Sequence, residues 1–271
     1  YSRPEKRFGY ALDDNARALA ACVNYYEMSG KPELLPLIEK CLDFMKFAQR
    51  PNGYFANIVN FRKEKGAGIS EDAQGRGIGA LGYVSSCMAI PEELRKGADK
   101  IFHRSLQPLM RLSSPKAAAF AMGGLYHHLK NFPNRKLMSI FRELADRIVK
   151  KYPCENSPES WCWFEDHLSY SNSVLPESLF CAYELTGKKI YLAVAEESLK
   201  FLSSITLQSV HYSPIGQNGW YFRNKMREYF DQQPEDAASM ARTKVTAYKI
   251  TRKKQHLEDA YKAFQWFLGK N

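Results

Sequence analysis

An aspartate followed by an arginine one helical turn later occurs twice in the chain. In the segments YALDDNARALAA and SEDAQGRGIGALG, Asp13 precedes Arg17 and Asp72 precedes Arg76 at the same spacing. Side chains four residues apart share one face of a helix. A carboxylate there can act as a general acid or base, and the arginine can hold it ionised or bind an acidic group of a substrate. The repeat therefore predicts that both pairs line one site.

Acidic residues open four of the predicted elements in this way. A simpler explanation exists for each of them, because carboxylates stabilise helix N-termini by about 0.3–2 kcal/mol without any catalytic role. Taken together, however, four acidic first turns directed at one face of the protein favour a functional cleft over helix capping alone. The four turns are Asp13 and Asp14, Glu71 and Asp72, Glu165 and Asp166, and Glu235 and Asp236.

Aromatic residues gather in the long loops near these carboxylates. The segment WCWFEDHLSY places aromatic rings and two carboxylates within ten residues. Sugar rings bind by stacking their C–H faces on aromatic side chains, so the combination indicates a carbohydrate ligand. Anchoring of the loops is the competing role for some of these rings. The residues are Tyr54, Trp161, Trp163, Phe164, Tyr170, Trp220 and Tyr221.

Apolar residues recur at helical spacing through most of the chain, which predicts an all-α protein with almost no strand. Short connectors join the helices into five pairs, and long loops separate the pairs. Hairpins that repeat in this way close into an (α/α) toroid of inner and outer helices, with the inner helices starting at the face that carries the long loops. We expect one toroid domain over residues 1–271. The predicted helices are 13–29, 33–49, 72–89, 92–111, 115–130, 134–151, 172–186, 188–205, 235–250 and 255–268.

Charge and cysteine content narrow the class of protein. The 271 residues carry a net charge of +10, but the basic residues are spread out and no nucleic-acid motif accompanies them, so we expect no nucleic-acid partner. No apolar run is long enough to span a membrane. The six cysteines lack disulfide spacing and are expected as free core thiols in a reducing compartment. A soluble, cytoplasmic protein is the expectation.

Neither a metal nor a cofactor is expected. The chain has no HExxH motif, no clustered His and Cys ligands and no EF-hand loop. The glycines of GRGIGALG run into a helix without a preceding strand, which favours close helix packing over dinucleotide binding. The adjacent pair His127 and His128 falls at the far end of a helix and is expected at the surface or in the core.

Five segments, in order along the chain, carry a family resemblance. GYALDDNARAL, SEDAQGRGIGALG, WFEDHLSYSNSVLPESL, FDQQPEDA and FQWFLGKN resemble motifs of a bacterial (α/α)-toroid family often fused behind, or associated with, retaining glycosyltransferases of the family-four type. The chain is more distantly similar to (α/α)-barrel glycoside hydrolases. The resemblance implies a toroid that acts on carbohydrate, with a glycosyltransferase domain or protein as a partner.

The chain also departs from that family pattern. The family reads Cys-Thr before the paired aspartates, where this chain has Ala11 and Leu12. The family continues beyond the last of these motifs, so a sixth hairpin is expected to be missing or incomplete.

Two classes of function stay open from the sequence. A glycoside hydrolase would use one carboxylic acid to protonate the leaving oxygen and one carboxylate as base or nucleophile. The second class is a glycan-binding accessory module of a glycosyltransferase system without catalysis of its own. A sugar epimerase is a weaker third choice, because it would need paired histidines in the site and only His167 and His211 lie in the long loops. The candidate acids are Glu165 and Asp166, the candidate bases Asp13, Asp14 and Asp72, and the candidate substrate-binding residues Arg17, Glu71, Arg76, Trp163, Tyr170, Trp220 and Glu235.

Overall fold

Helices dominate the computed structural model, which describes residues 5–153 and 161–270. All ten predicted helices are confirmed within these ranges, and their ends differ from the predicted ones by at most three residues. They are α1 (Leu12–Ser29), α2 (Leu35–Ala48), α3 (Glu71–Ser86), α4 (Glu92–Leu109), α5 (Pro115–Asn131), α6 (Arg135–Lys151), α7 (Val174–Thr186), α8 (Lys189–Thr206), α9 (Pro234–Thr251) and α10 (Gln255–Gln265).

Strand is confined, in the described ranges, to four elements of two residues each. They form two antiparallel pairs inside the long loops, as the low predicted strand content requires. The pairs are β1 (Tyr10–Ala11) with β2 (Ile58–Val59), and β3 (His167–Leu168) with β4 (Tyr221–Phe222).

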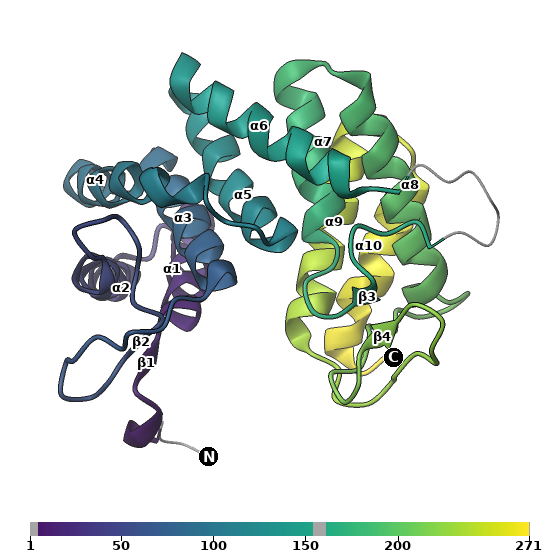
Figure 1. The fold of residues 1–271 in the computed structure, drawn as a ribbon, viewed down its shortest axis with the longest axis horizontal. Coiled ribbons are helices and arrows are strands. Elements are labelled where there is room, and N and C mark those ends of the chain that lie inside the picture. Colours follow the sequence, from purple (N-terminus) through teal and green to yellow (C-terminus); the bar gives the residue numbers. More distant parts are fainter. Residues whose placement is uncertain (1–4, 154–160, 271) are drawn as a thin grey trace. The chain divides into compact units, whose positions relative to one another are not determined.

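The chain forms two compact units, residues 1–144 and 145–271, with the boundary inside α6. In the first unit, α1 packs on α2 and α3, α2 packs on α4, and α3 packs on α4 and α5. Helices α1, α3 and α5 therefore follow one another as neighbours, with α2 and α4 beside them (Figure 1). Gly30 ends α1 with a left-handed φ of 65°, and its N–H donates to the Tyr26 carbonyl, which turns the chain into α2.

Helices α3 and α5 meet backbone to backbone. A Cβ atom added to Gly75 would lie 2.3 Å from the Ala117 carbonyl oxygen, and one added to Gly82 would lie 2.5 Å from the Gly124 carbonyl oxygen. Both contacts join residues with the same separation in sequence, so the two helices run parallel. The glycines of GRGIGALG thus serve close helix packing, as the sequence indicates.

Helices α1 and α3 also run parallel, because contacts join them near both ends. Near their starts the loop before α3 links the two, since the Leu12 N–H donates to the Asn57 carbonyl over 2.8 Å and the Gln74 side chain of α3 bonds the backbone of Phe55. At the other end the Tyr83 hydroxyl donates to Asn24 Oδ1 over 2.9 Å, a contact between residues 59 positions apart. Asp13 and Asp72 have the same separation, so the sequence repeat matches the register of the two helices.

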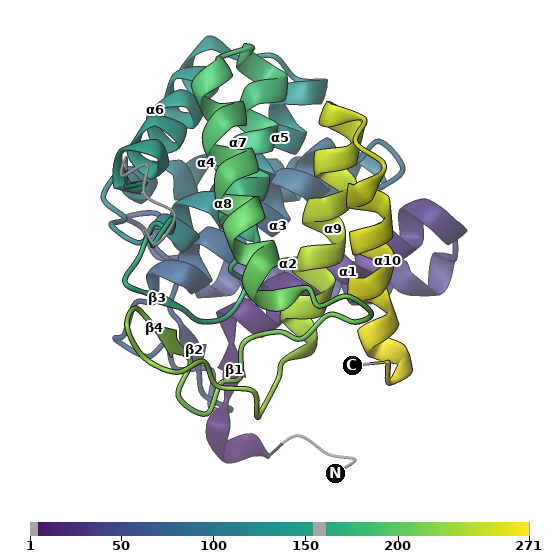
Figure 2. The same ribbon diagram turned by 90° about the vertical axis from the view of Figure 1, so that its right-hand side faces the viewer.

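The second unit contains the α7–α8 and α9–α10 pairs, joined through the packing of α7 on α9. Figure 2 shows the four helices side by side. The hydroxyl of Thr243 in α9 donates over 3.0 Å to the carbonyl of Ser173, just before α7. Arg242, also in the middle of α9, pairs with Glu177 in the first turn of α7 at 2.7 Å. The Ser171 hydroxyl, three residues before α7, donates to Glu235 in the first turn of α9, so the starts of the two helices lie close together.

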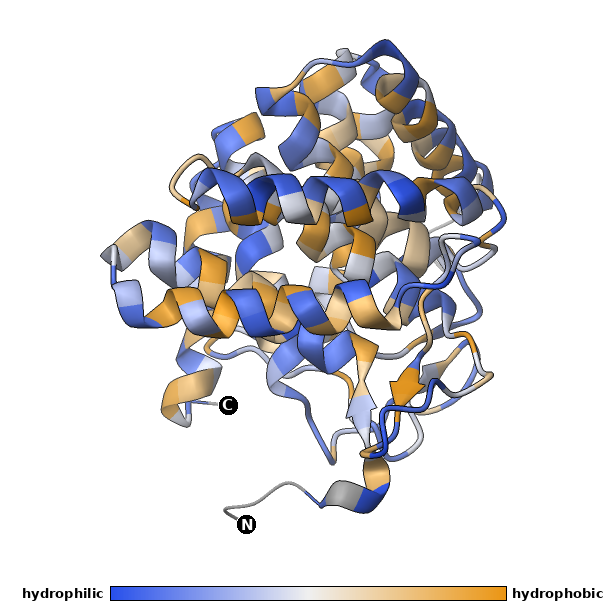
Figure 3. Ribbon diagram, turned by 90° about the vertical axis from the view of Figure 1, so that its left-hand side faces the viewer, coloured by the Kyte–Doolittle hydropathy of each residue, from blue (hydrophilic) through white to orange (hydrophobic). Residues whose placement is uncertain are grey.

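Apolar residues occupy one side of most helices, which appear as orange and blue stripes in Figure 3. The fully buried side chains include Leu19, Leu81 and Phe102 in the first unit and Phe180 and Tyr191 in the second. None of the described helices combines the length and the hydropathy that a membrane crossing requires.

The described cysteines carry free thiols, as expected. Cys87 and Cys181 are buried, and Cys22, Cys41 and Cys162 are half-buried. Cys154, the sixth, lies outside the described residues.

Adjacent glycines of α5 test the contact between α3 and α5. A Cβ at Gly124 would lie 2.5 Å from the Ile78 carbonyl oxygen, whereas a Cβ at Gly123 has no heavy atom within 4 Å. We predict that Gly124→Ala lowers the free energy of unfolding by about 1–3 kcal/mol through overpacking. Gly123→Ala is expected to be neutral or to stabilise by about 0.5–1 kcal/mol, because alanine favours the helix. Urea unfolding compares the two, and equal effects would contradict the packing.

His256 of α10 predicts a pH dependence of stability. Both of its ring nitrogens are buried without a hydrogen-bond partner. Burial lowers its pKa, the charge of Lys244 lowers it further, and Asp259 opposes the change. The unfolded chain therefore binds a proton near pH 6.5 that the folded chain does not, and stability falls as the pH drops below that value.

The measurement is urea unfolding at pH 7.5 and 5.5. One such proton contributes at most about 1.4 kcal/mol per pH unit. His256→Gln is expected to reduce the loss of stability between these values, while the exposed His127→Gln leaves it unchanged. A wild-type slope retained in His256→Gln would contradict the assignment.

Candidate functional site

The first turn of α1 presents a charged trio. Arg17 Nη2 lies 2.9 Å from Asp13 Oδ2 and 2.6 Å from Asp14 Oδ1. The side chains are 41%, 34% and 68% exposed for Arg17, Asp13 and Asp14 respectively. Solvent-exposed ion pairs of this kind contribute only about 0.2–1 kcal/mol. The trio is therefore available to a ligand at little cost in stability.

The first turn of α3 is tied to the start of α5. Glu71 Oε2 accepts hydrogen bonds from the backbone N–H groups of Ser113 at 2.8 Å and Ser114 at 2.6 Å. Asp72 Oδ1 accepts one from the Ser114 hydroxyl at 2.9 Å. The same hydroxyl caps α5 by accepting from Ala117 N–H. Glu71 thus acts as an anchor between two helix N-termini, a role that its sequence position does not reveal.

Arg76 differs from its sequence equivalent Arg17. Its guanidinium carbon lies 3.9 Å from the ring centroid of Phe120 in α5, within range for a cation–π interaction. Arg17 holds two carboxylates instead. The two arginines of the repeat therefore contact different groups, carboxylates at Arg17 and an aromatic ring at Arg76.

The loop before α3 is held by Gln74. Its side-chain oxygen accepts from Phe55 N–H at 3.1 Å, and its amide donates to the Phe55 carbonyl at 3.0 Å. Asn15, at the equivalent repeat position, donates to the Ala11 carbonyl at 2.8 Å. Both amides serve the backbone around the site. Because α1 and α3 are parallel, Asp13 and Asp72 begin neighbouring helices at the same end.

In the second unit, Trp163 is a core residue. It is 2% exposed, and its ring stacks on Phe201 of α8 with centroids 6.2 Å apart. Trp161 is half-buried between Phe201 and Tyr221, each at 5.2 Å. Loop anchoring accounts for Trp163, and its burial argues against the predicted stacking on a sugar.

The candidate acids follow these tryptophans directly. The Glu165 carbonyl accepts a 2.6 Å hydrogen bond from Trp161 Nε1, and the Asp166 carbonyl accepts one of 2.8 Å from Arg223 N–H. The Asp166 side chain is exposed and that of Glu165 is half-buried. Backbone bonds thus position both residues just before β3. The His167 ring stacks on Phe222 at 5.0 Å across the β3–β4 pair.

Tyr170 and Trp220 form a half-buried aromatic pair, with ring centroids 6.0 Å apart. Trp220 has a φ of 60°, a left-handed backbone conformation that is rare for a bulky residue. Such conformations concentrate at functional sites and persist only where the surroundings enforce them. Gly216 and Glu228 enforce this one through backbone hydrogen bonds to Trp220 of 3.1 and 3.2 Å.

Arg227 holds the same loop together. Its guanidinium donates to the carbonyls of Ile205 and Ser213, and over 3.1 Å to the carbonyl of Pro214. Burial lowers the pKa of Arg227, and neighbouring tyrosines oppose that change. One half-buried guanidinium thus ties together three backbone carbonyls around the loop that carries Trp220.

The first turns of α7 and α9 are joined by side chains. Glu235 Oε1 accepts from the Ser171 hydroxyl, and Asp236 is buried. Arg242 pairs with Glu177 through hydrogen bonds of 2.8 and 2.7 Å from Nε and Nη2. The sequence pattern does not reveal this pair, because its partners lie 65 residues apart. Glu177 could have been noticed as an acidic residue in the first turn of a helix, as at Asp13 and Asp72.

Similar solved structures are carbohydrate-processing enzymes. Cellobiose 2-epimerase from Bacillus thermoamylovorans matches with a TM-score of 0.74 and 12% identity over 98% of this chain and 78% of that chain. A sugar epimerase from a ruminal bacterium matches with a TM-score of 0.73 and 14% identity over 98% and 77%. The GH76 α-mannanase BT2949 of Bacteroides thetaiotaomicron gives 0.68 and 13% over 96% and 74%.

No protein-family model matches the chain, and no curated protein sequence matches it. The structural matches are (α/α) toroids, and they confirm the predicted (α/α)-toroid fold class for this chain. At identities of 10–14%, they establish the fold and leave the reaction to be argued from the residues.

Glu71 and Asp14 separate anchoring from exposure. We predict that Glu71→Ala lowers the free energy of unfolding by about 1–3 kcal/mol, because two backbone N–H groups lose a charged acceptor. Asp14→Ala, which removes an exposed ion pair, is expected to cost less than about 1 kcal/mol. Urea unfolding of both variants measures the difference. A neutral Glu71→Ala would contradict the anchoring role.

Proposed function

We propose that this chain hydrolyses glycosidic bonds in an oligosaccharide or polysaccharide. The observation that carries the proposal is the parallel register of α1 and α3, which puts Asp13 and Asp72 at the same end of neighbouring helices. Glycoside hydrolysis needs two carboxyl groups, one as acid and one as base or nucleophile. The similarity in fold to a GH76 α-mannanase adds support.

Roles are proposed residue by residue. Asp13, Asp14 and Asp72 are the candidate bases or nucleophiles, and Arg17 contacts the first two over 2.9 and 2.6 Å. Glu165 and Asp166, which follow the tryptophans of the loop before β3, are the candidate acids. Glu71 is better assigned to anchoring than to substrate binding, because its carboxylate accepts two backbone N–H groups.

The test is product analysis after incubation with cello-oligosaccharides and manno-oligosaccharides, sugars related to those named for the similar structures. We expect new reducing ends with the wild type. Loss of a general acid or base lowers the rate by about 10²–10⁴-fold, so Asp13→Asn, Asp72→Asn, Glu165→Gln and Asp166→Asn are compared one by one. At least one of the four variants is expected to lose activity on this scale.

Asp43→Asn provides the control, because Asp43 is an exposed carboxylate of α2. It is expected to leave the rate unchanged, and circular dichroism checks that each variant is folded. Cleavage that survives in all four candidate variants would remove these carboxylates from the mechanism. Conversion of cellobiose to its epimer without cleavage would replace hydrolysis by epimerisation.

A second candidate is a glycan-binding module that serves a glycosyltransferase domain or protein. The observation that favours it is the Tyr170–Trp220 pair, because an aromatic ring held in a rare backbone conformation can serve as a sugar platform without any reacting group. Such a module would bind glycan and show no turnover.

Trp220→Ala tests this platform. We predict weaker binding of whichever oligosaccharide the wild type retains in affinity electrophoresis, by about 0.5–1.5 kcal/mol or roughly 2–12-fold, through loss of one aromatic contact. Trp161 packs between the Phe201 and Tyr221 rings, so Tyr221→Phe, which preserves the ring beside Trp161, is the matched control. Unchanged binding by Trp220→Ala would contradict the platform role.

A further inference from the structure

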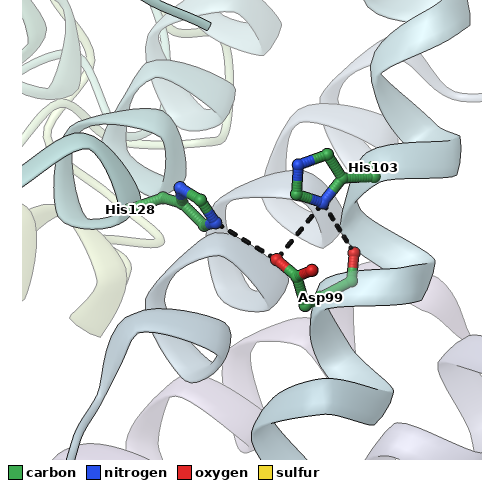
Figure 4. Close-up of side chains that lie close together, drawn as sticks. All are labelled: Asp99, His103 and His128. Carbon is green, nitrogen blue, oxygen red and sulfur yellow. Dashed lines mark hydrogen bonds and ion pairs between the residues drawn. The ribbon is translucent and has the colours of Figure 1, made fainter. Parts of the chain in front are cut away.

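Two histidines and an aspartate converge between α4 and α5. Asp99 Oδ1 lies 3.2 Å from His103 Nδ1, one turn along α4, and 3.1 Å from His128 Nε2 in the last turn of α5. Figure 4 shows both rings directed at the same carboxylate. Among the residues that the structure describes, this is the group of three His, Cys, Asp or Glu side chains whose ligand atoms all lie within 4.8 Å of one another.

The spacing matches that of ligands around a small divalent ion. Zn²⁺ binds histidine nitrogen at about 2.0–2.1 Å and carboxylate oxygen at about 2.0–2.2 Å in tetrahedral geometry, which places neighbouring ligand atoms about 3.3–3.5 Å apart. The observed separations of 3.1 and 3.2 Å from Asp99 Oδ1 lie close to that value. Two imidazoles and one carboxylate are also a donor set that suits Zn²⁺, Co²⁺ and Ni²⁺.

The surroundings hold one ligand in place and leave the others accessible. The His128 side chain is only 7% exposed, and its ring stacks on Phe102 with centroids 5.1 Å apart. His128 Nδ1 is buried without a hydrogen-bond partner, so Nε2 is the nitrogen that faces the cluster. His103 and Asp99 are 45% and 43% exposed, which gives an ion a route from solvent.

We propose that Asp99, His103 and His128 form a binding site for a divalent transition-metal ion, with Zn²⁺ as the preferred occupant. Three protein ligands leave at least one position for water. The site would clamp α4 to α5 near the end of α5 opposite Ser114, which is about 21 Å from His128 along the helix axis. It is therefore separate from the carboxylates at the starts of α1 and α3, and the clamp stabilises the first unit instead of taking part in sugar chemistry.

The cluster has a chemical explanation without metal, in which the two imidazoles simply hydrogen-bond the carboxylate. His103 Nδ1 also lies 3.0 Å from the Asp99 carbonyl oxygen, in keeping with that arrangement. Metal binding would replace these hydrogen bonds, because each coordinating nitrogen must carry no proton.

The experiment titrates the chelator-treated full chain with Zn²⁺ by calorimetry, and with Co²⁺ by absorption spectroscopy. We expect one Zn²⁺ per chain, a higher melting temperature with Zn²⁺, and Co²⁺ d–d bands without a thiolate charge-transfer band. His103→Ala removes an exposed ligand at little risk to folding. It and Asp99→Asn are expected to weaken Zn²⁺ binding by more than the ~10–100-fold typical for loss of an outer partner of a ligand.

His127→Ala is the matched control, because His127 is the exposed neighbour of His128 and contacts the Tyr83 and Tyr126 rings instead. It is expected to keep wild-type Zn²⁺ affinity. Three results would overturn the proposal: no Zn²⁺ binding by the folded wild type, equal weakening in His127→Ala and His103→Ala, or a Co²⁺–thiolate band that assigns the ion to cysteine.

Discussion

Direct contact between the backbones of α3 and α5 determines where the polar residues of the first unit lie. The helices approach so closely that Gly75, Gly82 and Gly124 have no room for a Cβ atom. Once these glycines set the register, Glu71 and Asp72 must face the start of α5, where Ser113 and Ser114 offer N–H and hydroxyl donors. Packing at the helix centres thus decides hydrogen bonding at their ends.

The acidic first turns consequently differ in physical role despite their similar sequences. The Glu71 carboxylate binds two backbone N–H groups at the N-terminus of a neighbouring helix. The partial positive charge of that terminus stabilises the carboxylate further. Asp13 and Asp14 face an arginine at a largely exposed surface, where an ion pair contributes little to folding. The stability of the fold therefore explains the position of Glu71 but not that of Asp13 and Asp14. For this reason the proposed chemistry is assigned to the aspartates.

Local pattern was enough to predict the helices but not their partners. The ten helices follow from apolar periodicity, and their ends shift by a few residues where one-turn 3₁₀ segments adjoin them, as at Pro32–Leu34 and Trp266–Leu268. The 59-residue repeat carried genuine register information, since Asn24 and Tyr83 touch at that separation. The anchoring of Glu71 and the Arg242–Glu177 pair could not be predicted, because each depends on a partner brought close only by folding.

The same limit explains why two tryptophans with similar sequence surroundings have different environments. Trp163 is followed by carboxylates but packs on Phe201, because the apolar face of α8 must be covered. Trp220 lies in a loop whose position depends on polar contacts, chiefly the carbonyls that Arg227 binds. Hydrogen bonds hold both loops, but only Trp163 also covers an apolar helix face, and it is 2% exposed as a result. Trp220 stays half-buried beside Tyr170, so of the two rings it is the one that a ligand can reach.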